Sequence, residues 1–186
     1  MGSILGNRVV RVEDPRFLTT GGRYVDDIHF EGEAHVAYVR SPFAHATIES
    51  IDVDDALEVP GVLRIFTAAD LDGKVGAIPS ARPGMPEAMG QVVLATDRVR
   101  HVGQAVCAVV AETAAAAYDA VDLVFVDYEP LPVVLDPEQS ATNETLRFPD
   151  AGTNAVVDLA SSSQADVTGC EVVVEERIVN QRLSGA

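Results

Sequence analysis

The sequence predicts an α+β fold (mixed α/β) in which strands outnumber two or three short helices. Short apolar or alternating runs of strand length recur between residues 34 and 132, and Gly- and Pro-rich turn signals separate them. One helix-like stretch follows the most apolar of these runs. With 186 residues, 47% of them hydrophobic, the chain can bury one sizeable core.

We expect residues 1–19 to form an extended arm, in which residues 1–16 are polar and charged and Phe17 and Leu18 could anchor it. Pro15 disfavours helical backbone in the residue before it, which supports the extended prediction. Residues 19–22, Thr-Thr-Gly-Gly, form a turn signal, and residues 23–27 are expected to form a short strand with an acidic end.

Three strands are expected next, over residues 34–39, 46–53 and 62–66. The first alternates its side chains with the period of two that is typical of a half-buried strand. Residues 52–58 are expected to form one helical turn, stopped by Pro60 and the glycine that follows it.

A second short helix and a long loop are expected after these strands. Thr67 and Asp70 have the spacing of a helix start, with Asp in place of the usual Glu or Gln. Gly73 is placed to end this helix after about two turns. Residues 74–96 hold Pro79, Pro83, Gly84, Pro86 and Gly90, show little periodicity and are expected to form a loop.

The stretch over residues 97–132 reads as strand, helix and strand, and we expect it to be the structural centre of the chain. Residues 105–111 are continuously apolar, which is typical of a strand buried on both faces. Positions 114, 117, 118 and 121 have helical spacing and predict one buried helix face. A second strand is expected over residues 123–126. Such a unit predicts a right-handed crossover onto one sheet.

The remaining residues, 136–186, are expected to form a strap that returns one more strand. Residues 133–154 are loop-like, with Asp136-Pro137, Asn143, Pro149 and Gly152. Residues 171–179 are rich in β-branched side chains and predict a strand. The compact part is therefore expected to cover residues 20–135.

Composition excludes several classes of protein. The net charge of −16 argues against nucleic-acid binding, which needs a basic surface. No apolar run approaches the ~18 residues of a membrane span, and no secretory signal is evident. Two cysteines, Cys107 and Cys170, are too few for a disulfide scaffold and are compatible with a reducing cytoplasm.

Motifs for catalysis or metal binding are weak. The sequence has no Gly-x-Gly-x-x-Gly, no phosphate loop and no Cys-x-x-Cys. His29 and His35 could approach one another across a turn, but surface histidines are the favoured interpretation. The acidic pairs 26–27, 54–55 and 175–176 are interpreted as solvated charge.

A nucleophilic site would have to use Ser41 or Cys107 with His45 or His101. Ser41 lies in a Ser-Pro turn and lacks the Gly-x-Ser-x-Gly elbow. Cys107 stands between apolar neighbours, where burial would raise its pKa and suppress the thiolate. We therefore predict no catalytic residues and no metal ligands.

Seven segments, in order, resemble the N-terminal part of the large subunit of the molybdenum hydroxylases. That family includes carbon monoxide dehydrogenase large chains, xanthine dehydrogenases and aldehyde oxidases, and the carbon monoxide dehydrogenase branch is the most similar. The segments are Glu13-Asp-Pro-Arg-Phe-Leu-Thr-Thr-Gly-Gly-Arg-Tyr-Val-Asp-Asp27, Ala37-Tyr-Val-Arg-Ser-Pro-Phe-Ala-His-Ala46, Pro60-Gly-Val62, Thr67-Ala-Ala-Asp-Leu71, Val99-Arg-His-Val-Gly103, Ala108-Val-Val-Ala-Glu112 and Val126-Asp-Tyr-Glu-Pro-Leu-Pro132.

This resemblance implies an α/β-hammerhead domain and an oxidoreductase with a molybdopterin cytosine dinucleotide cofactor. It implies a FAD-binding medium subunit, a small subunit with a 2Fe–2S cluster, and a large-subunit homodimer. Gln181 matches a family glutamine that hydrogen-bonds the molybdenum centre, so it is the one cofactor-binding residue we expect. Family large subunits are several times longer than this chain. Residues 136–186 are then the strap and the truncated start of the molybdopterin-binding domain.

We therefore expect a scaffold fragment that holds no cofactor and is inactive alone, because catalysis needs a cofactor oriented by a complete site. The alternative from the sequence is a free-standing interaction module with the same fold. The sequence does not predict the substrate, since the loop expected to select it is not part of this sequence.

Overall fold

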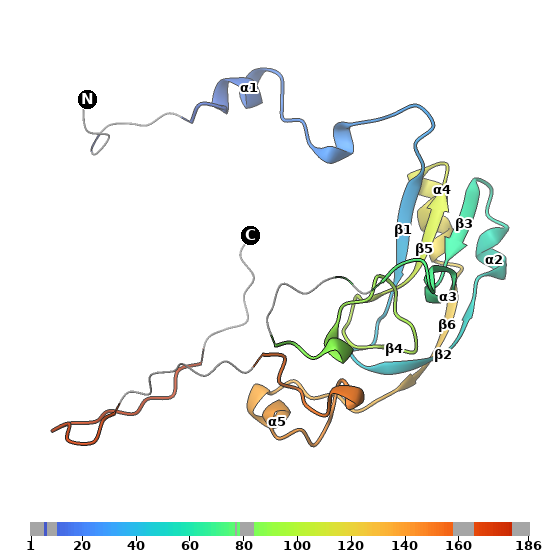
Figure 1. The fold of residues 1–186 in the computed structure, drawn as a ribbon. Helices are drawn as coiled ribbons and strands as arrows, with labels where there is room; N and C mark the ends of the chain where they lie inside the picture. The colour runs from blue at the N-terminus through green and yellow to red at the C-terminus, as the bar shows by residue number, and fades with distance from the viewer. Residues whose placement is uncertain (1–5, 7–10, 77, 79–83, 158–165, 180–186) are drawn as a thin grey trace.

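Two three-stranded antiparallel sheets form the centre of the molecule (Figure 1). The computed structural model describes residues 6, 11–76, 78, 84–157 and 166–179. One sheet has the order β1-β5-β3 and the other has the order β4-β2-β6. The strands are β1 (His35–Arg40), β2 (Ala46–Asp52), β3 (Val62–Phe66), β4 (Arg98–Val99), β5 (Ala105–Ala111) and β6 (Phe125–Pro130). The expected α+β class, rich in strands, is confirmed.

Short helices connect these strands. The α-helices are α1 (Asp14–Thr19), α2 (Asp54–Leu57), α3 (Ala68–Leu71), α4 (Ala114–Val121) and α5 (Pro137–Ala141). Single 3₁₀ turns cover Val25–Asp27, Glu87–Met89 and Pro149–Ala151. Only α4 reaches two turns, so packing on the sheets and not helix propensity has to stabilise these elements.

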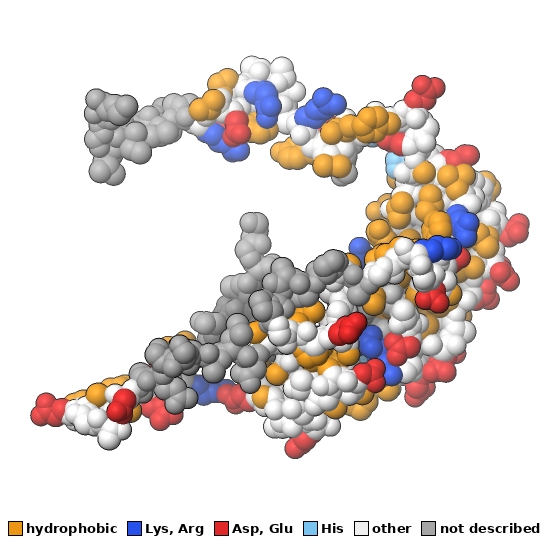
Figure 2. All heavy atoms as spheres, viewed as in Figure 1, with side chains coloured by type: hydrophobic (Ala, Val, Ile, Leu, Met, Phe, Trp, Pro, Cys, Tyr) orange, Lys and Arg blue, Asp and Glu red, His pale blue; other side chains and the backbone are white. Residues whose placement is uncertain are grey.

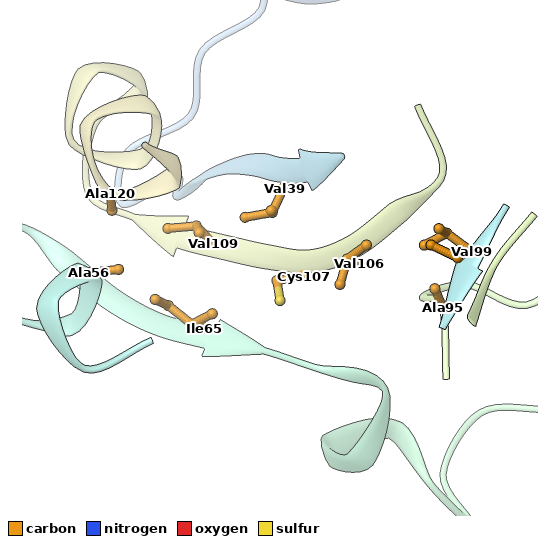
Figure 3. Close-up of a cluster of buried hydrophobic side chains, with 10 residues drawn as sticks. Val39, Ala56, Ile65, Ala95, Val99, Val106, Cys107, Val109 and Ala120 are labelled. Carbon is orange, nitrogen blue, oxygen red and sulfur yellow. The ribbon is translucent and has the colours of Figure 1, made fainter. Parts of the chain in front are cut away.

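The core lies between the two sheets, α2 and α4 (Figure 3). β5 supplies Val106, Cys107 and Val109, because it is the central strand of its sheet and has β1 and β3 on its two edges. The fully buried side chains are small or β-branched: Val99, Val106, Cys107, Val109 and several alanines. Such side chains allow close packing at a low cost in side-chain entropy. The predicted buried strand over residues 105–111 is confirmed.

The predicted crossover of strand, helix and strand onto one sheet is wrong. β5 and β6, on either side of α4, belong to different sheets. β5 is already hydrogen-bonded to β1 on one edge and to β3 on the other, so no edge is left for another strand. β6 pairs instead with β2, from Ala46 opposite Pro130 to Asp52 opposite Phe125. β6 also begins two residues later than the predicted strand.

The buried face of α4 differs from the one that helical spacing predicts. Ala117 and Ala120 are buried, whereas Tyr118 is 67% exposed. Ala117 packs with Ala37 of β1 and Ala111 of β5, so the helix and the sheet meet through methyl groups. A tyrosine ring on that face would hold the helix away from the sheet, which explains why the helix is rotated from the predicted orientation.

The N-terminal segment contains a helix where an extended arm was expected. Pro15 occupies the first turn of α1, where its missing N–H needs no partner and its fixed φ suits a helix. The strand predicted over residues 23–27 is a 3₁₀ turn instead. It is closed by Asp27, whose Oδ2 accepts a hydrogen bond from the Tyr24 N–H at 2.8 Å.

Two connections also differ in detail from the predictions. α3 starts as expected, with the Thr67 N–H donating to Asp70 Oδ2 at 2.8 Å, but it makes one turn and not two. Residues 133–154, expected as loop, contain α5, where Pro137 stands in the first turn and Asp136 Oδ1 accepts from the Gln139 N–H at 2.8 Å.

The strand predicted over residues 171–179 does not form. These residues belong to no helix or strand, and Val172, Val174 and Ile178 are each more than three-quarters exposed. β-branched side chains favour strand backbone, but a strand also needs a hydrogen-bonded neighbour. Within the described residues, the Arg177 guanidinium links this segment to the Glu138 carboxylate of α5, with an Nη2–Oε1 distance of 2.8 Å.

Candidate functional site

Ser41, one of the two candidate nucleophiles, closes the turn that follows β1. It is buried, and its Oγ donates to the Phe43 carbonyl and accepts from the Phe43 N–H, both at 3.0 Å. Its own backbone is held by the strand opposite, since its N–H donates to the Gln104 carbonyl at 2.9 Å. All of these bonds serve the turn, so the hydroxyl has a structural role.

His45 lies at the start of β2 and is also buried. Its Nδ1 is 2.9 Å from the carbonyl oxygen of Pro132, and because a carbonyl can only accept, Nδ1 carries the proton. Within the described part of the chain, His45 Nε2 is buried and has no hydrogen-bond partner. Among the described residues no hydrogen bond joins His45 to Ser41, so the pair does not make a base and a nucleophile.

Tyr128 packs against the same turn, with its ring centroid 5.2 Å from that of Phe43. Burial raises the pKa of the Tyr128 hydroxyl, which therefore stays neutral. Ser41, Phe43, His45 and Tyr128 thus join the end of β1 to the start of β2 and to β6. These four side chains connect the β1-β5-β3 sheet to the β4-β2-β6 sheet.

Cys107, the other candidate nucleophile, lies in the middle of β5. Burial raises the pKa of its thiol to about 11, so almost no thiolate exists at neutral pH. His101 is exposed, and its pKa is lowered by partial burial and by the nearby Arg147. In the described part of the chain no hydrogen bond connects Cys107 with a histidine. The structure therefore shows no base beside the Cys107 thiol among the described residues, and that neither residue is catalytic stays a prediction.

The two N-terminal histidines do approach one another, and a carboxylate stands between them. Glu33 Oε1 is 2.9 Å from His29 Nδ1 and 3.9 Å from His35 Nε2. The pKa of Glu33 is lowered, first by the hydrogen bond that its carboxylate accepts from the Phe30 N–H and then by His29. Among the described residues no three His, Cys, Asp or Glu side chains are arranged to hold a metal ion.

The sequence did not predict one cluster, in which two arginine side chains contact a phenylalanine ring. The Arg100 guanidinium lies 4.9 Å from the centre of the Phe148 ring, and that of Arg147 lies 5.8 Å from it. Arg100 is mostly buried and its pKa is lowered by that burial, with Asp97 3.7 Å away acting in the opposite direction. The cluster fixes the segment after β6 against the region of β4. Sequence spacing of 47 residues gave no signal for it.

A shallow groove of about 360 Å³ lies between α3 and the segment that precedes β4. Its walls are mostly aliphatic, including Leu71, Val75, Val93 and Leu94, and Asp72 and Thr96 supply its polar side chains. Of the residues that the structure describes, its lining contains no histidine, cysteine or basic side chain. The described lining therefore offers one ionisable side chain, Asp72, and no histidine that could serve as its partner in acid–base chemistry.

The segment that folds into the two sheets matches one known domain family. The sequence model described as "Aldehyde oxidase and xanthine dehydrogenase, a/b hammerhead domain" matches residues 19–132, which include both sheets and α2 to α4. The chain belongs to the aldehyde oxidase and xanthine dehydrogenase family. The two three-stranded sheets and the helices between them are its hammerhead domain.

Known relatives of this hammerhead chain are subunits of larger enzymes. It is 47% identical to the nicotine 6-hydroxylase large subunit of Paenarthrobacter nicotinovorans over 74% of this chain and 17% of that subunit. It is 35% identical to subunit gamma of the 6-hydroxypseudooxynicotine dehydrogenase complex of the same organism, over 97% of this chain and 24% of that subunit. The chain thus spans about a fifth of the length of these relatives.

The chain is also similar in structure to a solved member of this family. The crystal structure of the Cu,Mo-CO dehydrogenase in the carbon monoxide reduced state matches with a TM-score of 0.62 and 43% identity. The match covers 73% of the hammerhead chain and 17% of the dehydrogenase chain. The family resemblance expected from the seven sequence segments is confirmed.

The described residues of the hammerhead chain do not fit a molybdenum cofactor. They offer no metal-binding set, as stated above, and the polar groups buried without a partner belong to the joint between the sheets and to Arg100. Gln181, the predicted cofactor-binding residue, lies outside the described residues. Among the helices of the described part, none is long and apolar enough to cross a membrane.

Proposed function

We propose that this chain is the N-terminal scaffold part of the large subunit of a molybdenum-cofactor oxidoreductase and is inactive alone. One observation carries the proposal: three-quarters of the chain matches a hydroxylase large subunit at 47% identity, yet the match covers 17% of that subunit. The hammerhead domain also uses its buried polar and thiol groups for packing, which leaves no catalytic set among the described residues.

The proposed organisation has three parts: an arm over residues 1–19, the hammerhead domain over 20–135, and a strap over 136–186 that enters the cofactor-binding part. Gln181 would contact the cofactor there, and the cofactor would be molybdopterin cytosine dinucleotide, which supplies the redox chemistry when bound. The exposed β-branched segment 171–179 supports this organisation, because such a segment is stable as a strand only beside further polypeptide.

The proposed partners are a FAD-binding subunit, a subunit with a 2Fe–2S cluster, and a second large subunit. Support comes from the relatives, one of which is named as a subunit of a complex. We place the complex in the cytoplasm, where the thiols of Cys107 and Cys170, both free in the structure, would stay reduced. The reaction would be an oxidative hydroxylation or the oxidation of carbon monoxide.

The experiment compares the 186-residue chain with the whole large subunit made together with its partner subunits. Molybdenum is measured by mass spectrometry, and the pterin by fluorescence after oxidation. We expect no molybdenum or pterin in the short chain and stoichiometric amounts in the whole enzyme. Molybdenum bound to the short chain would refute the claim that it is inactive alone.

Gln181→Ala in the whole enzyme tests the cofactor contact. Replacing a residue that supports a metal centre typically costs about 10–100-fold in activity or affinity. The matched control is Gln139→Ala, an exposed glutamine of α5, which should leave turnover unchanged. Equal turnover in both variants would remove Gln181 from the site.

The alternative, a free-standing interaction module, predicts a different product in the source cells. An antibody against residues 35–132 should detect the large subunit on a denaturing gel. A band at 19.7 kDa as the main product would favour the module and contradict the scaffold.

A further inference from the structure

The β1-β5-β3 sheet has one face that no described helix covers. α4 packs on the other face, where it meets Ala37 and Ala111. Side chains alternate along a strand, so the neighbours of these residues point away from α4. The uncovered side, called the outer face below, carries Val36, Tyr38 and Arg40 of β1, Ala108 and Val110 of β5, and Arg64 and Phe66 of β3.

The strand register arranges the outer face in rows. Tyr38 stands opposite Ala108, which stands opposite Phe66, so a small side chain separates two aromatic rings. The next row places Val36 opposite Val110 and Val110 opposite Arg64. The centre of the face is therefore apolar over all three strands, and Figure 2 shows apolar side chains gathered there beside Lys or Arg.

Two arginines hold fixed positions at the edges of these rows. The Arg40 guanidinium lies 5.3 Å from the centre of the Tyr38 ring and donates from Nη1 to the Gly103 carbonyl at 2.9 Å. The Arg64 guanidinium lies 4.8 Å from the centre of the Phe66 ring and 3.5 Å from Asp70 Oδ1. Both charges are thus held over aromatic rings, in contacts that are worth about 0.5–1 kcal/mol at exposed sites.

This surface is unusual for a chain with a net charge of −16. Val36 is 51% and Tyr38 43% exposed. Exposed apolar patches that span several strands mark interaction sites in soluble proteins. Aromatic side chains and arginine are the residue types enriched in the centres of protein interfaces. An occupant should offer small or apolar side chains to the rows and carboxylates to the two guanidinium groups.

A second copy of the chain fits this surface poorly. A two-fold interface places the same patch on both sides, which would bring four guanidinium groups together with Asp70 as the nearby counter-charge. A segment of the same polypeptide fits better. Relatives have about four times as much chain as is present here, and covalent linkage raises the effective concentration of such a segment to the millimolar range or above.

We propose that the outer face of the β1-β5-β3 sheet is the docking surface for a carboxylate-bearing, apolar segment of the remaining large-subunit polypeptide. The proposal rests on the proposed function, because it needs a longer subunit. It goes further by naming which face of the hammerhead domain is covered, and which chemistry covers it.

Hydroxyl-radical footprinting of Tyr38 and Phe66 tests the proposal. It is carried out on the 186-residue chain, on the large subunit alone, and on the complete enzyme. We expect Tyr38 to be oxidised in the short chain and about tenfold more slowly in the large subunit alone, as for a side chain in an interface core. Tyr118, on the opposite side of the sheet, is the internal control and should stay reactive in the short chain and in the large subunit alone.

Three results would overturn the proposal. Tyr38 could remain reactive in the complete enzyme, it could become protected only when the other subunits are added, or the short chain could show concentration-dependent protection that indicates a second copy. These outcomes are separate from a failure of the proposed function, which the molybdenum content of the same samples reports.

A substitution gives an independent check. Tyr38→Glu should leave the melting temperature of the short chain nearly unchanged, because the side chain is partly exposed there. In the large subunit it should increase the oxidation of Phe66 at least about fivefold, since a charge in an apolar interface is strongly unfavourable. Tyr118→Glu is the matched control and should leave Phe66 protected. Equal protection of Phe66 in both variants would contradict docking at this face.

Discussion

Apolar side chains are buried in the hammerhead body but exposed in the two segments that flank it. In the body, residues 35–132, buried valines and alanines fill the space between the sheets. In the flanks, residues 11–30 and 166–179, large apolar side chains such as Leu18, Phe30 and Val174 are largely exposed. Figure 2 shows both flanks extending from the body with apolar side chains at their surface. The flanks thus carry residues suited to a core but have no core in this chain.

The difference shows that local pattern and tertiary partner are separate requirements. β5 and the segment 171–179 both contain β-branched residues, three valines in β5 and four valines and one isoleucine in the segment. β5 has a neighbour on each edge and becomes the central strand. The segment 171–179 has no strand neighbour among the described residues and stays unpaired. The flanks are accordingly the surfaces where further polypeptide is most needed.

The largest expected effect comes from placing a charge in each region. Val109→Asp in β5 would bury a carboxylate without a partner and should lower the free energy of unfolding by about 4 kcal/mol or more. Val174→Asp in the flank should change it by less than about 0.5 kcal/mol, since that side chain is 82% exposed. Urea denaturation of the 186-residue chain measures both. Similar losses for the two variants would mean that the flank is part of the cooperative unit.

The two cysteines give a second test of the same comparison. Cys170, exposed in the flank, should react with a maleimide within minutes at pH 7, whereas Cys107 should react only on unfolding. Because the pKa of Cys107 is raised from 9.0 to about 11, folding holds its proton more tightly than the unfolded chain does.

Deprotonation of Cys107 should make the folded protein less stable at high pH. Stability from Cys107 is fully present below pH 9.0 and is lost as the pH rises toward about 11, by at most ~3 kcal/mol. Cys107→Ala removes the ionisable group and should flatten this part of the stability profile, while Cys170→Ala should leave it unchanged. Chemical denaturation between pH 8 and 11 measures the profiles. An identical loss in the Cys107→Ala variant would assign the pH dependence to another group.

The smallest expected effects come from two helix caps. Thr113 Oγ1 accepts from the Ala116 N–H at 3.1 Å and caps α4, which packs on the β1-β5-β3 sheet. Thr113→Ala should lower the free energy of global unfolding by about 1 kcal/mol. Asp136→Ala removes the cap of α5, which buries none of its residues, so α5 should fray without a change in the global value. Equal destabilisation by both substitutions would mean that α5 unfolds together with the body.

Much of the body could be predicted from sequence because its signals are local. Alternation defined β1, the apolar run defined β5, and the Thr67–Asp70 spacing defined the start of α3. The burial of Cys107 could also be predicted, since its apolar neighbours already indicated a raised pKa. Pro15 misled the prediction because the same residue disfavours helix before it and favours helix after it.

The sequence by itself determined which residues could form strands, which cysteine would be inert, and which family the chain resembles. Only the tertiary structure decided that β5 and β6 belong to different sheets, because both edges of β5 are taken by strands distant in sequence. It also decided that α4 turns Ala117 and Ala120 inward, and that Arg100 and Arg147 meet at Phe148. A period of hydrophobicity specifies which face of an element is buried, but not which neighbour will cover it.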